Sequence, residues 1–194
     1  MKGIVFTELI GMVEATLGDE VADRVICGAN TATDGAYTSV GTYDYQELIS
    51  LVEQLACETG QPEAALVQSF GEYLFQRFLA MFPQFFDGVD SSISFLPTIE
   101  DRVHVEVRKL YPDAELPTFA CKLENDGTLV LEYQSKRPFA DLAEGLIHAS
   151  VRHFQDDVSL VRHNLGDQDG TQARFELTPT LNQPNDTVAS ACQT

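Results

Sequence analysis

Three side chains with complementary hydrogen-bonding groups alternate along one short segment of the sequence. Tyr133, Ser135 and Arg137 stand two residues apart. In an extended strand, residues at this spacing point to the same face. A guanidinium recognises a carboxylate through paired hydrogen bonds, and the two hydroxyls add further donors. The segment could therefore bind a ligand with one or two carboxylates beside an apolar body, or form the outward polar face of an ordinary amphipathic strand.

A single histidine, His104, lies in an apolar stretch upstream of this segment. Ile99, Val103 and Val107 are its apolar neighbours in the sequence. A histidine in this setting can be a core residue whose hydrogen bonds are satisfied. It can also be the ligand of a metal in an apolar pocket, because imidazole is a common metal ligand. The residue alone leaves both interpretations open.

The apolar spacing predicts which elements position these side chains. Apolar residues recur with the period of a helix in five segments. These segments are about 2–17, 19–27, 45–58, 62–79 and 139–154. Residues 91–111 fit a helix and a strand equally well, because Val103, Val105 and Val107 alternate while Ile99, Val103 and Val107 share a helical face.

After Pro117 the apolar period changes to two, which indicates strands. The sequence Asn125-Asp126-Gly127 is a strong hairpin turn signal. Four strands are expected, at about 118–124, 128–135, 158–162 and 174–177. The chain is therefore an α+β protein, with a helical half followed by a half that carries an antiparallel sheet. The polar segment 179–194 is expected to be a disordered tail.

Together these residues resemble the heme nitric oxide/oxygen binding (H-NOX) domain family. The resemblance covers residues 1–178 and indicates one domain over that range. Its features are His104 in an apolar segment, Pro117 thirteen residues later, the run Tyr133-Gln134-Ser135-Lys136-Arg137, the start Met1–Val5, and the stretch 71–86 that ends in FPQFF.

The resemblance implies an H-NOX-like fold, in which heme lies between an N-terminal helical subdomain and a helical and antiparallel-sheet subdomain. It implies that residues 91–111 include a helix and that His104 is the axial ligand of a heme b (iron protoporphyrin IX) iron. Tyr133, Ser135 and Arg137 would bind the heme propionates. Pro117 would press on the porphyrin and distort it.

The same resemblance bears on which gas binds. Some oxygen-binding relatives carry a tyrosine five residues after the motif arginine, and Leu142 stands at that position here. The matching supporting positions in the first and fourth helices are Leu9 and Leu74, which are also apolar. Oxygen would lack a stabilising hydrogen bond, so we expect NO and CO to bind and oxygen to be excluded. The remaining distal wall is expected from residues that could also be ordinary core: Val5, Phe75, Phe78 and Leu146.

Composition limits the possible partners. The 194 residues include 12 basic and 30 acidic side chains, for a net charge of −18. Such a chain would repel nucleic acids and anionic membrane surfaces. Glu8 and Glu14 interrupt any signal-peptide core, and four scattered cysteines suggest free thiols. A cytoplasmic protein is expected.

The leading interpretation is a stand-alone bacterial-type NO sensor that is not itself an enzyme. The resemblance implies that its output lies in a separate chain, either a histidine kinase or a cyclic-di-GMP enzyme. The alternative is a binding module without heme, which would use the Tyr133–Arg137 segment to hold a carboxylated apolar ligand. An enzymatic heme site is disfavoured, because the expected distal side has no clear acid or base.

Overall fold

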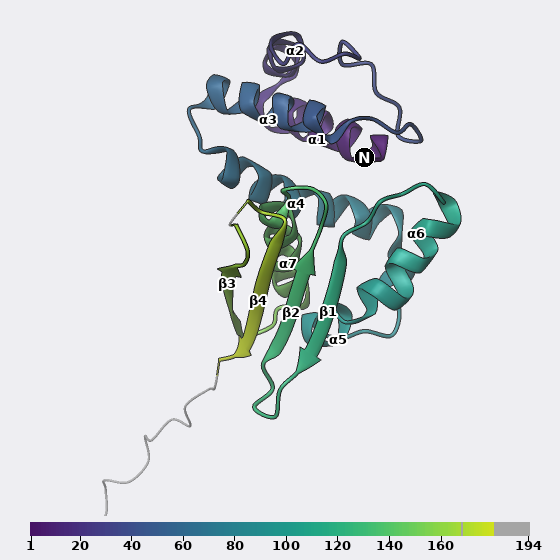
Figure 1. Cartoon of the computed structure of the whole chain (residues 1–194), viewed down its shortest axis with the longest axis vertical. Coiled ribbons are helices and arrows are strands. Elements are labelled where there is room, and N and C mark those ends of the chain that lie inside the picture. The colour runs from purple at the N-terminus through teal and green to yellow at the C-terminus, as the bar shows by residue number, and fades with distance from the viewer. Residues whose placement is uncertain (168, 181–194) are drawn as a thin grey trace, which may run out of the picture.

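The computed structural model describes residues 1–167 and 169–180 of the chain (Figure 1). Three helices, α1 to α3, lie together in a helical half, and α4 crosses beneath them. The second half is a four-stranded sheet with α7 packed behind it and α6 beside β1. The expected tail falls outside the described residues from position 181 onward.

The expected helices and strands are confirmed, and their ends differ from the prediction by at most two residues. In chain order the elements are α1 (Gly3–Leu17), α2 (Asp19–Gly28), α3 (Tyr45–Thr59), α4 (Glu63–Met81), the 3-10 turn η1 (Pro83–Phe86), α5 (Ser92–Phe95), the π-helical turn η2 (Ile99–Val103), α6 (His104–Leu110), β1 (Thr118–Leu123), β2 (Leu129–Gln134), α7 (Ala140–Phe154), β3 (Val158–Asn164) and β4 (Gln172–Pro179).

The sheet is antiparallel throughout, with strand order β1-β2-β4-β3. The expected hairpin joins β1 to β2, and Gly127 in its turn has a positive φ of 87°. Strand β4 continues through Pro179, so the sheet includes the first residue of the expected tail. Tyr133 pairs with Phe119 on one side and Ala173 on the other, which places it inside the sheet.

The ambiguous segment is helical, as the resemblance implies. The π-helical turn η2 leads directly into α6, and His104 is the first residue of α6. Arg102 fixes this turn to the preceding loop, since its guanidinium donates to the carbonyls of Asp87 and Gln84, each at 2.7 Å. Val105 is 38% exposed, so the alternating valines do not form the buried face of a strand.

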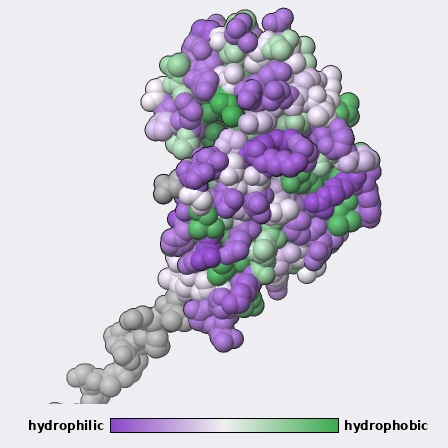
Figure 2. Space-filling view, viewed as in Figure 1, coloured by the Kyte–Doolittle hydropathy of each residue, from purple (hydrophilic) through white to green (hydrophobic). Residues whose placement is uncertain are grey.

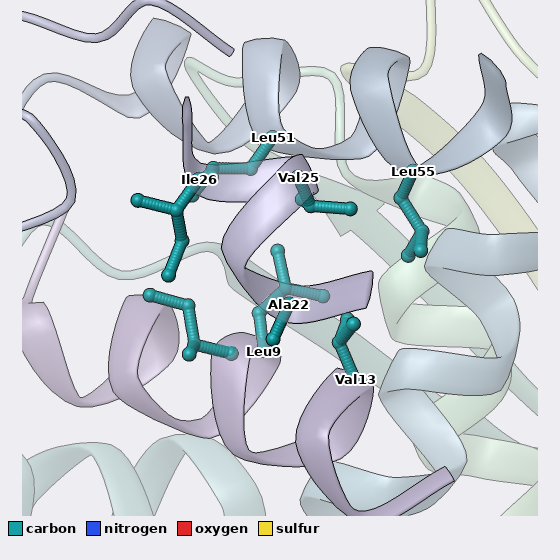
Figure 3. Close-up of a pocket in the computed structure, with 8 residues that line it drawn as sticks. Leu9, Val13, Ala22, Val25, Ile26, Leu51 and Leu55 are labelled. Carbon is teal, nitrogen blue, oxygen red and sulfur yellow. The ribbon is translucent and has the colours of Figure 1, made fainter. Parts of the chain in front are cut away.

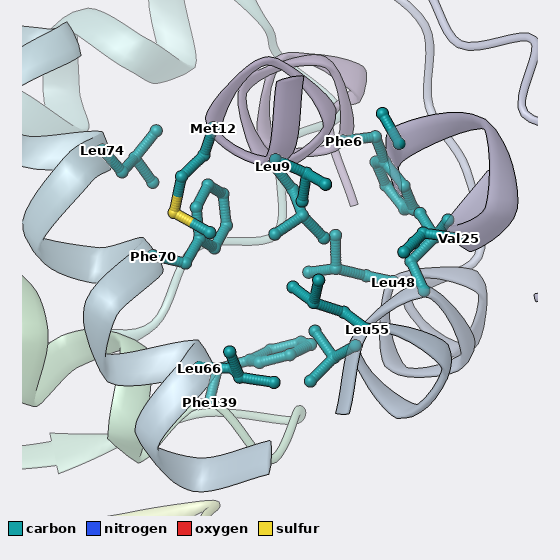
Figure 4. Close-up of a cluster of buried hydrophobic side chains, with 14 residues drawn as sticks. Phe6, Leu9, Met12, Val25, Leu48, Leu55, Leu66, Phe70, Leu74 and Phe139 are labelled. Carbon is teal, nitrogen blue, oxygen red and sulfur yellow. The ribbon is translucent and has the colours of Figure 1, made fainter. Parts of the chain in front are cut away.

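Two apolar clusters form the core. The helical cluster gathers side chains from α1 to α4, together with Phe139 from the start of α7 (Figure 4). The sheet cluster lies between the sheet, α7 and the segment around α5, with Leu131, Phe175 and Leu177 fully buried. The face shown in Figure 2 is mostly hydrophilic, with only small separate apolar patches.

The described residues include neither a membrane-length apolar helix nor a disulfide. No helix in residues 1–167 and 169–180 is both long and apolar enough to cross a membrane. The cysteines of this part of the chain, Cys27, Cys57 and Cys121, are free thiols, as expected.

Helices α4 and α7 approach so closely that their contact requires glycine on both sides. A Cβ added to Gly145 would collide with the backbone carbonyl oxygen of Gln68. A Cβ added to Gly71 would collide with the carbonyl oxygen of Leu142. Because backbone atoms cannot rotate away, this contact fixes how the helix between the two halves crosses the helix behind the sheet.

We predict that Gly145→Ala destabilises the fold by about 1–3 kcal/mol, as other overpacking changes do. Gly11→Ala is the matched control, because an added Cβ there would meet only the Tyr73 hydroxyl, at 3.8 Å. The control should be neutral or stabilising, by up to about 1 kcal/mol, since alanine favours helix. Urea unfolding followed by circular dichroism measures both, and equal stability of the two variants would contradict the prediction.

Candidate functional site

The three motif side chains share one face, as their spacing predicts. Tyr133 is 3% exposed and Ser135 and Arg137 are half-buried, while Gln134 and Lys136 between them are exposed. Strand β2 itself ends at Gln134, one residue earlier than expected. The alternation continues past its end, because the backbone N–H of Ser135 donates to the Thr171 carbonyl at 2.8 Å.

Arg137 already binds a carboxylate. Its Nη2 lies 2.6 Å from Oε2 of Glu115, and its Nη1 donates to the Glu115 backbone carbonyl at 2.9 Å. The guanidinium also lies over the ring of Tyr45 on α3, 5.9 Å from its centroid, and its side chain is only 13% exposed. The Ser135 hydroxyl accepts from the Arg137 backbone N–H at 3.0 Å. The arrangement is therefore suited to carboxylate recognition.

The loop from Tyr111 to Pro117, which we call the α6–β1 loop, contacts both halves of the molecule. Asp113 binds Lys2 and Thr42 of the helical half, at 3.3 and 2.9 Å. These hydrogen bonds hold the pKa of Asp113 below its ordinary value. Lys136, from the other half, donates a hydrogen bond to Glu115. This hydrogen bond and the charge of Arg137 lower the pKa of Glu115 below its ordinary value.

Two open clefts meet at this loop. One, of about 560 Å³, lies between the N-terminus, residues 42–45, Asp113–Glu115 and the pair Lys136 and Arg137. The other, of about 250 Å³, is lined by Arg108, residues 114–116 and the motif segment 135–137. Arg137 and Glu115 line both, so a ligand in either cleft would meet the same charged pair.

His104 is buried, with 8% of its surface exposed, and its ring is held from one side. Its Nδ1 lies 3.0 Å from Oε1 of Glu100. A carboxylate partner favours the tautomer with the proton on Nδ1, which leaves the lone pair on Nε2. Burial lowers the pKa of His104, against the opposing effect of Glu100. The ring is thus favoured in its neutral form, which is the form that binds metals.

Aromatic rings connect His104 to the motif. The ring of Phe119 on β1 lies 6.2 Å from the His104 ring and 5.5 Å from the Tyr133 ring, between centroids. Pro117 is half-buried two residues before Phe119, at the start of the sheet. Imidazole, two hydroxyls and a guanidinium suit an apolar iron complex with carboxylates, so these residues fit a heme.

The expected distal residues are divided between the two clusters. Leu9 and Leu74 are each 2% exposed in the helical cluster, against which partly buried residues pack. Those partners include Val5, Phe78, Leu142 and Leu146. Phe75 instead packs in the sheet cluster, with its ring 5.5 Å from Phe86. Leu146 packs against both clusters, so it links Phe75 to the other distal candidates.

Leu9 also borders a small internal void between α1, α2 and α3 (Figure 3). Its volume is about 10 Å³, and apolar side chains alone line it. A space of this size holds at most one water, and it offers no polar partner. The void is a packing gap within the helical half and not a ligand site.

Three residues of the site were not expected from the sequence. Glu100 stands four residues before His104, which is the spacing of neighbours on a helix and is a usable signal. Glu115 and Tyr45 contact Arg137 from distant segments of the chain. Glu115 precedes Arg137 by 22 residues. Nothing in the local sequence links either of them to the motif.

The fold brings a buried histidine, a tyrosine and an arginine from α6 and the end of β2 to the region between the helical half and the sheet. A family model described as Haem-NO-binding matches residues 2–162. The chain belongs to this H-NOX family, whose members are heme-based gas sensors.

Solved structures agree with this assignment. The chain is 33% identical to the Fe(II) unliganded H-NOX protein from K. algicida, with a TM-score of 0.86 over 94% of this chain and 98% of that one. It is 36% identical to the H-NOX protein from Shewanella woodyi, bound to IWP-051 in the Fe(II)CO state, with a TM-score of 0.80 over 98% of this chain and 100% of that one. It is 29% identical to the H-NOX protein from S. oneidensis in the Fe(II)NO state, with a TM-score of 0.84 over 93% of this chain and 100% of that one. No curated protein matches the chain.

Burial raises the pKa of the Tyr133 phenol above its ordinary value of 10.0. The unfolded chain then releases this proton near pH 10 while the folded protein retains it, so stability falls as pH rises above about 10. We predict that Tyr133→Phe loses less stability between pH 8 and pH 10.5 than the parent protein does. Urea unfolding at the two pH values tests this, and an identical loss in both proteins would contradict it.

Proposed function

We propose that this chain is a sensor that binds NO and CO at a ferrous heme b, excludes oxygen and has no enzymatic activity of its own. The observation that carries the proposal is the buried His104, whose Nδ1 lies 3.0 Å from Oε1 of Glu100, an arrangement that leaves Nε2 for a metal. When bound, the heme iron supplies the coordination position for a diatomic gas. His104 would be the residue that ligates this iron.

The position of Arg137 supports the proposal that the Tyr133–Arg137 segment binds the heme propionates. Its guanidinium binds the Glu115 carboxylate at 2.6 Å in a largely buried setting, so it is already arranged for an acidic group. Tyr133 and Ser135 share its face and would add hydroxyl donors. Pro117 lies where the α6–β1 loop enters β1, and we propose that its ring contacts the porphyrin.

The proposed gas selectivity follows from the chemistry of the distal candidates. Leu9, Leu74 and Leu142 all lack a hydrogen-bond donor. Oxygen acquires negative charge on ferrous iron and is stabilised by a donor, whereas NO binds strongly without one. Val5, Phe78 and Leu146 would complete this apolar wall, with Phe75 supporting it from the sheet cluster.

The proposed output is a change in the position of α6. Because α6 begins at His104, α6 and the attached α6–β1 loop would shift between the halves when a gas binds. We propose one sensor domain over residues 1–178 that acts in the cytoplasm on a separate histidine kinase or cyclic-di-GMP enzyme. The charge of −18 suits a basic patch on such a protein and does not suit nucleic acid or an anionic membrane.

The main test is the absorption spectrum of the reduced protein with NO, with CO and in air. We expect NO and CO adducts, a five-coordinate NO spectrum and no stable oxygen adduct. His104→Gly should lose the iron–histidine spectrum and regain it with added imidazole. His163→Gln is the matched control, because this histidine is exposed on β3 and 3.7 Å from Glu176.

Two outcomes would contradict the proposal. A six-coordinate NO complex together with a stable oxygen adduct would exclude the proposed selectivity. Equal spectra in His104→Gly and the parent protein would exclude His104 as the ligand. If a carboxylated apolar ligand bound equally well to His104→Gly and to the parent protein, the alternative function, a binding module without heme, would be favoured.

Leu142→Tyr tests the distal side directly. Leu142 is half-buried on α7 and packs against the helical cluster, so a phenol there would bring a donor to the apolar wall. We predict that this variant slows oxygen dissociation enough to give a stable adduct in air, while CO binding changes little. Leu142→Phe is the control for added volume. Equal oxygen affinity in the two variants would show that the hydroxyl is not the cause.

A further inference from the structure

Glu100 is the residue whose contacts extend furthest beyond the proposed function. We propose that Glu100 is a positioning residue for His104: its carboxylate fixes the tautomer and orientation of the imidazole and makes Nε2 a stronger ligand. This inference rests on the proposed heme function. It concerns how strongly His104 binds iron and not whether it does.

The geometry begins with the backbone. Glu100 lies in the π-helical turn η2, and the His104 backbone N–H closes this turn on the Ile99 carbonyl. The side chains of Glu100 and His104 meet across it, with 3.0 Å between Oε1 and Nδ1. Wide helical turns of this kind often occur at functional sites.

A second hydrogen bond fixes the carboxylate itself. The backbone N–H of Phe119 on β1 donates to the same Oε1 of Glu100 at 2.9 Å. Oε2 faces Arg108, whose Nη2 lies 3.8 Å away. The carboxylate is therefore anchored to a strand of the sheet, and it cannot follow the histidine freely if α6 moves.

This arrangement is that of a metal-binding histidine supported by a carboxylate. A carboxylate that accepts from Nδ1–H draws negative charge onto the ring and raises the basicity of Nε2. The iron–histidine bond becomes stronger, and the ring is held in one orientation. A purely structural Glu100 would join η2 to β1 through Phe119 without changing the ligand strength of His104.

The experiment compares Glu100→Gln and Glu100→Leu with the parent protein, all reduced and loaded with heme. Resonance Raman spectroscopy gives the iron–histidine stretching frequency, and transfer to apomyoglobin gives the rate of heme loss. We expect the frequency to fall in Glu100→Gln, which keeps a neutral acceptor, and to fall further in Glu100→Leu. Heme loss from Glu100→Leu should be roughly ten times faster or more.

Glu106→Gln on α6 is the matched control. The side chain of Glu106 is 46% exposed, and its partner is Lys109, at 2.6 Å, so the same change of charge is made two residues after His104. Its frequency should equal that of the parent protein. Should Glu100→Leu fail to fold, the isosteric Glu100→Gln decides the result alone.

The outcomes separate this inference from the proposed function. An iron–histidine band in the parent protein that is unchanged in both Glu100 variants would overturn the role of Glu100 and leave the heme site intact. Absence of any His104-dependent band in the heme-loaded parent protein would overturn the proposed function itself. A graded fall in frequency with an unchanged Glu106 control supports the inference.

Discussion

The close contact between α4 and α7 is the constraint on which the rest of the structure depends. At Gly71 and Gly145 the two helices meet backbone to backbone, and no other residue type fits there. Because Gly71 touches the carbonyl of Leu142, the crossing also sets where the first turns of α7 lie against the helical half. The distal candidates Leu74 and Leu142 therefore owe their positions to a contact that has no polar chemistry of its own.

The second link between the halves is of the opposite kind. The α6–β1 loop is held by ion pairs and hydrogen bonds of Asp113 and Glu115, and both carboxylates are exposed. Exposed ion pairs add little stability and are screened by salt. The two halves are thus joined by a rigid apolar crossing and by a weaker polar connection at the loop.

The elements were predictable because their residues repeat with the period of the structure that they form. The shared face of Tyr133 and Arg137 was predictable for the same reason. The segment 91–111 was not, since Val103 and Val107 satisfy both periods and the choice depends on what packs around them. The pairing of Arg137 with Glu115, and the place of Phe75 in the sheet cluster, depend on the tertiary fold and leave no local pattern.

Glu100 and the α6–β1 loop join the chemistry of His104 to the rest of the molecule. His104 opens α6, the loop follows α6, and Glu100 ties the same helical segment to Phe119 at the start of the sheet. The hydrogen bonds of Glu100 with His104 and with the Phe119 backbone N–H connect the start of α6 to β1. Under the proposed function, a shift of α6 would begin beyond η2, because the Phe119 hydrogen bond ties η2 to β1. The loop is where Lys2 and Arg137 connect the two halves, and a change at one buried nitrogen would thus reach the surface.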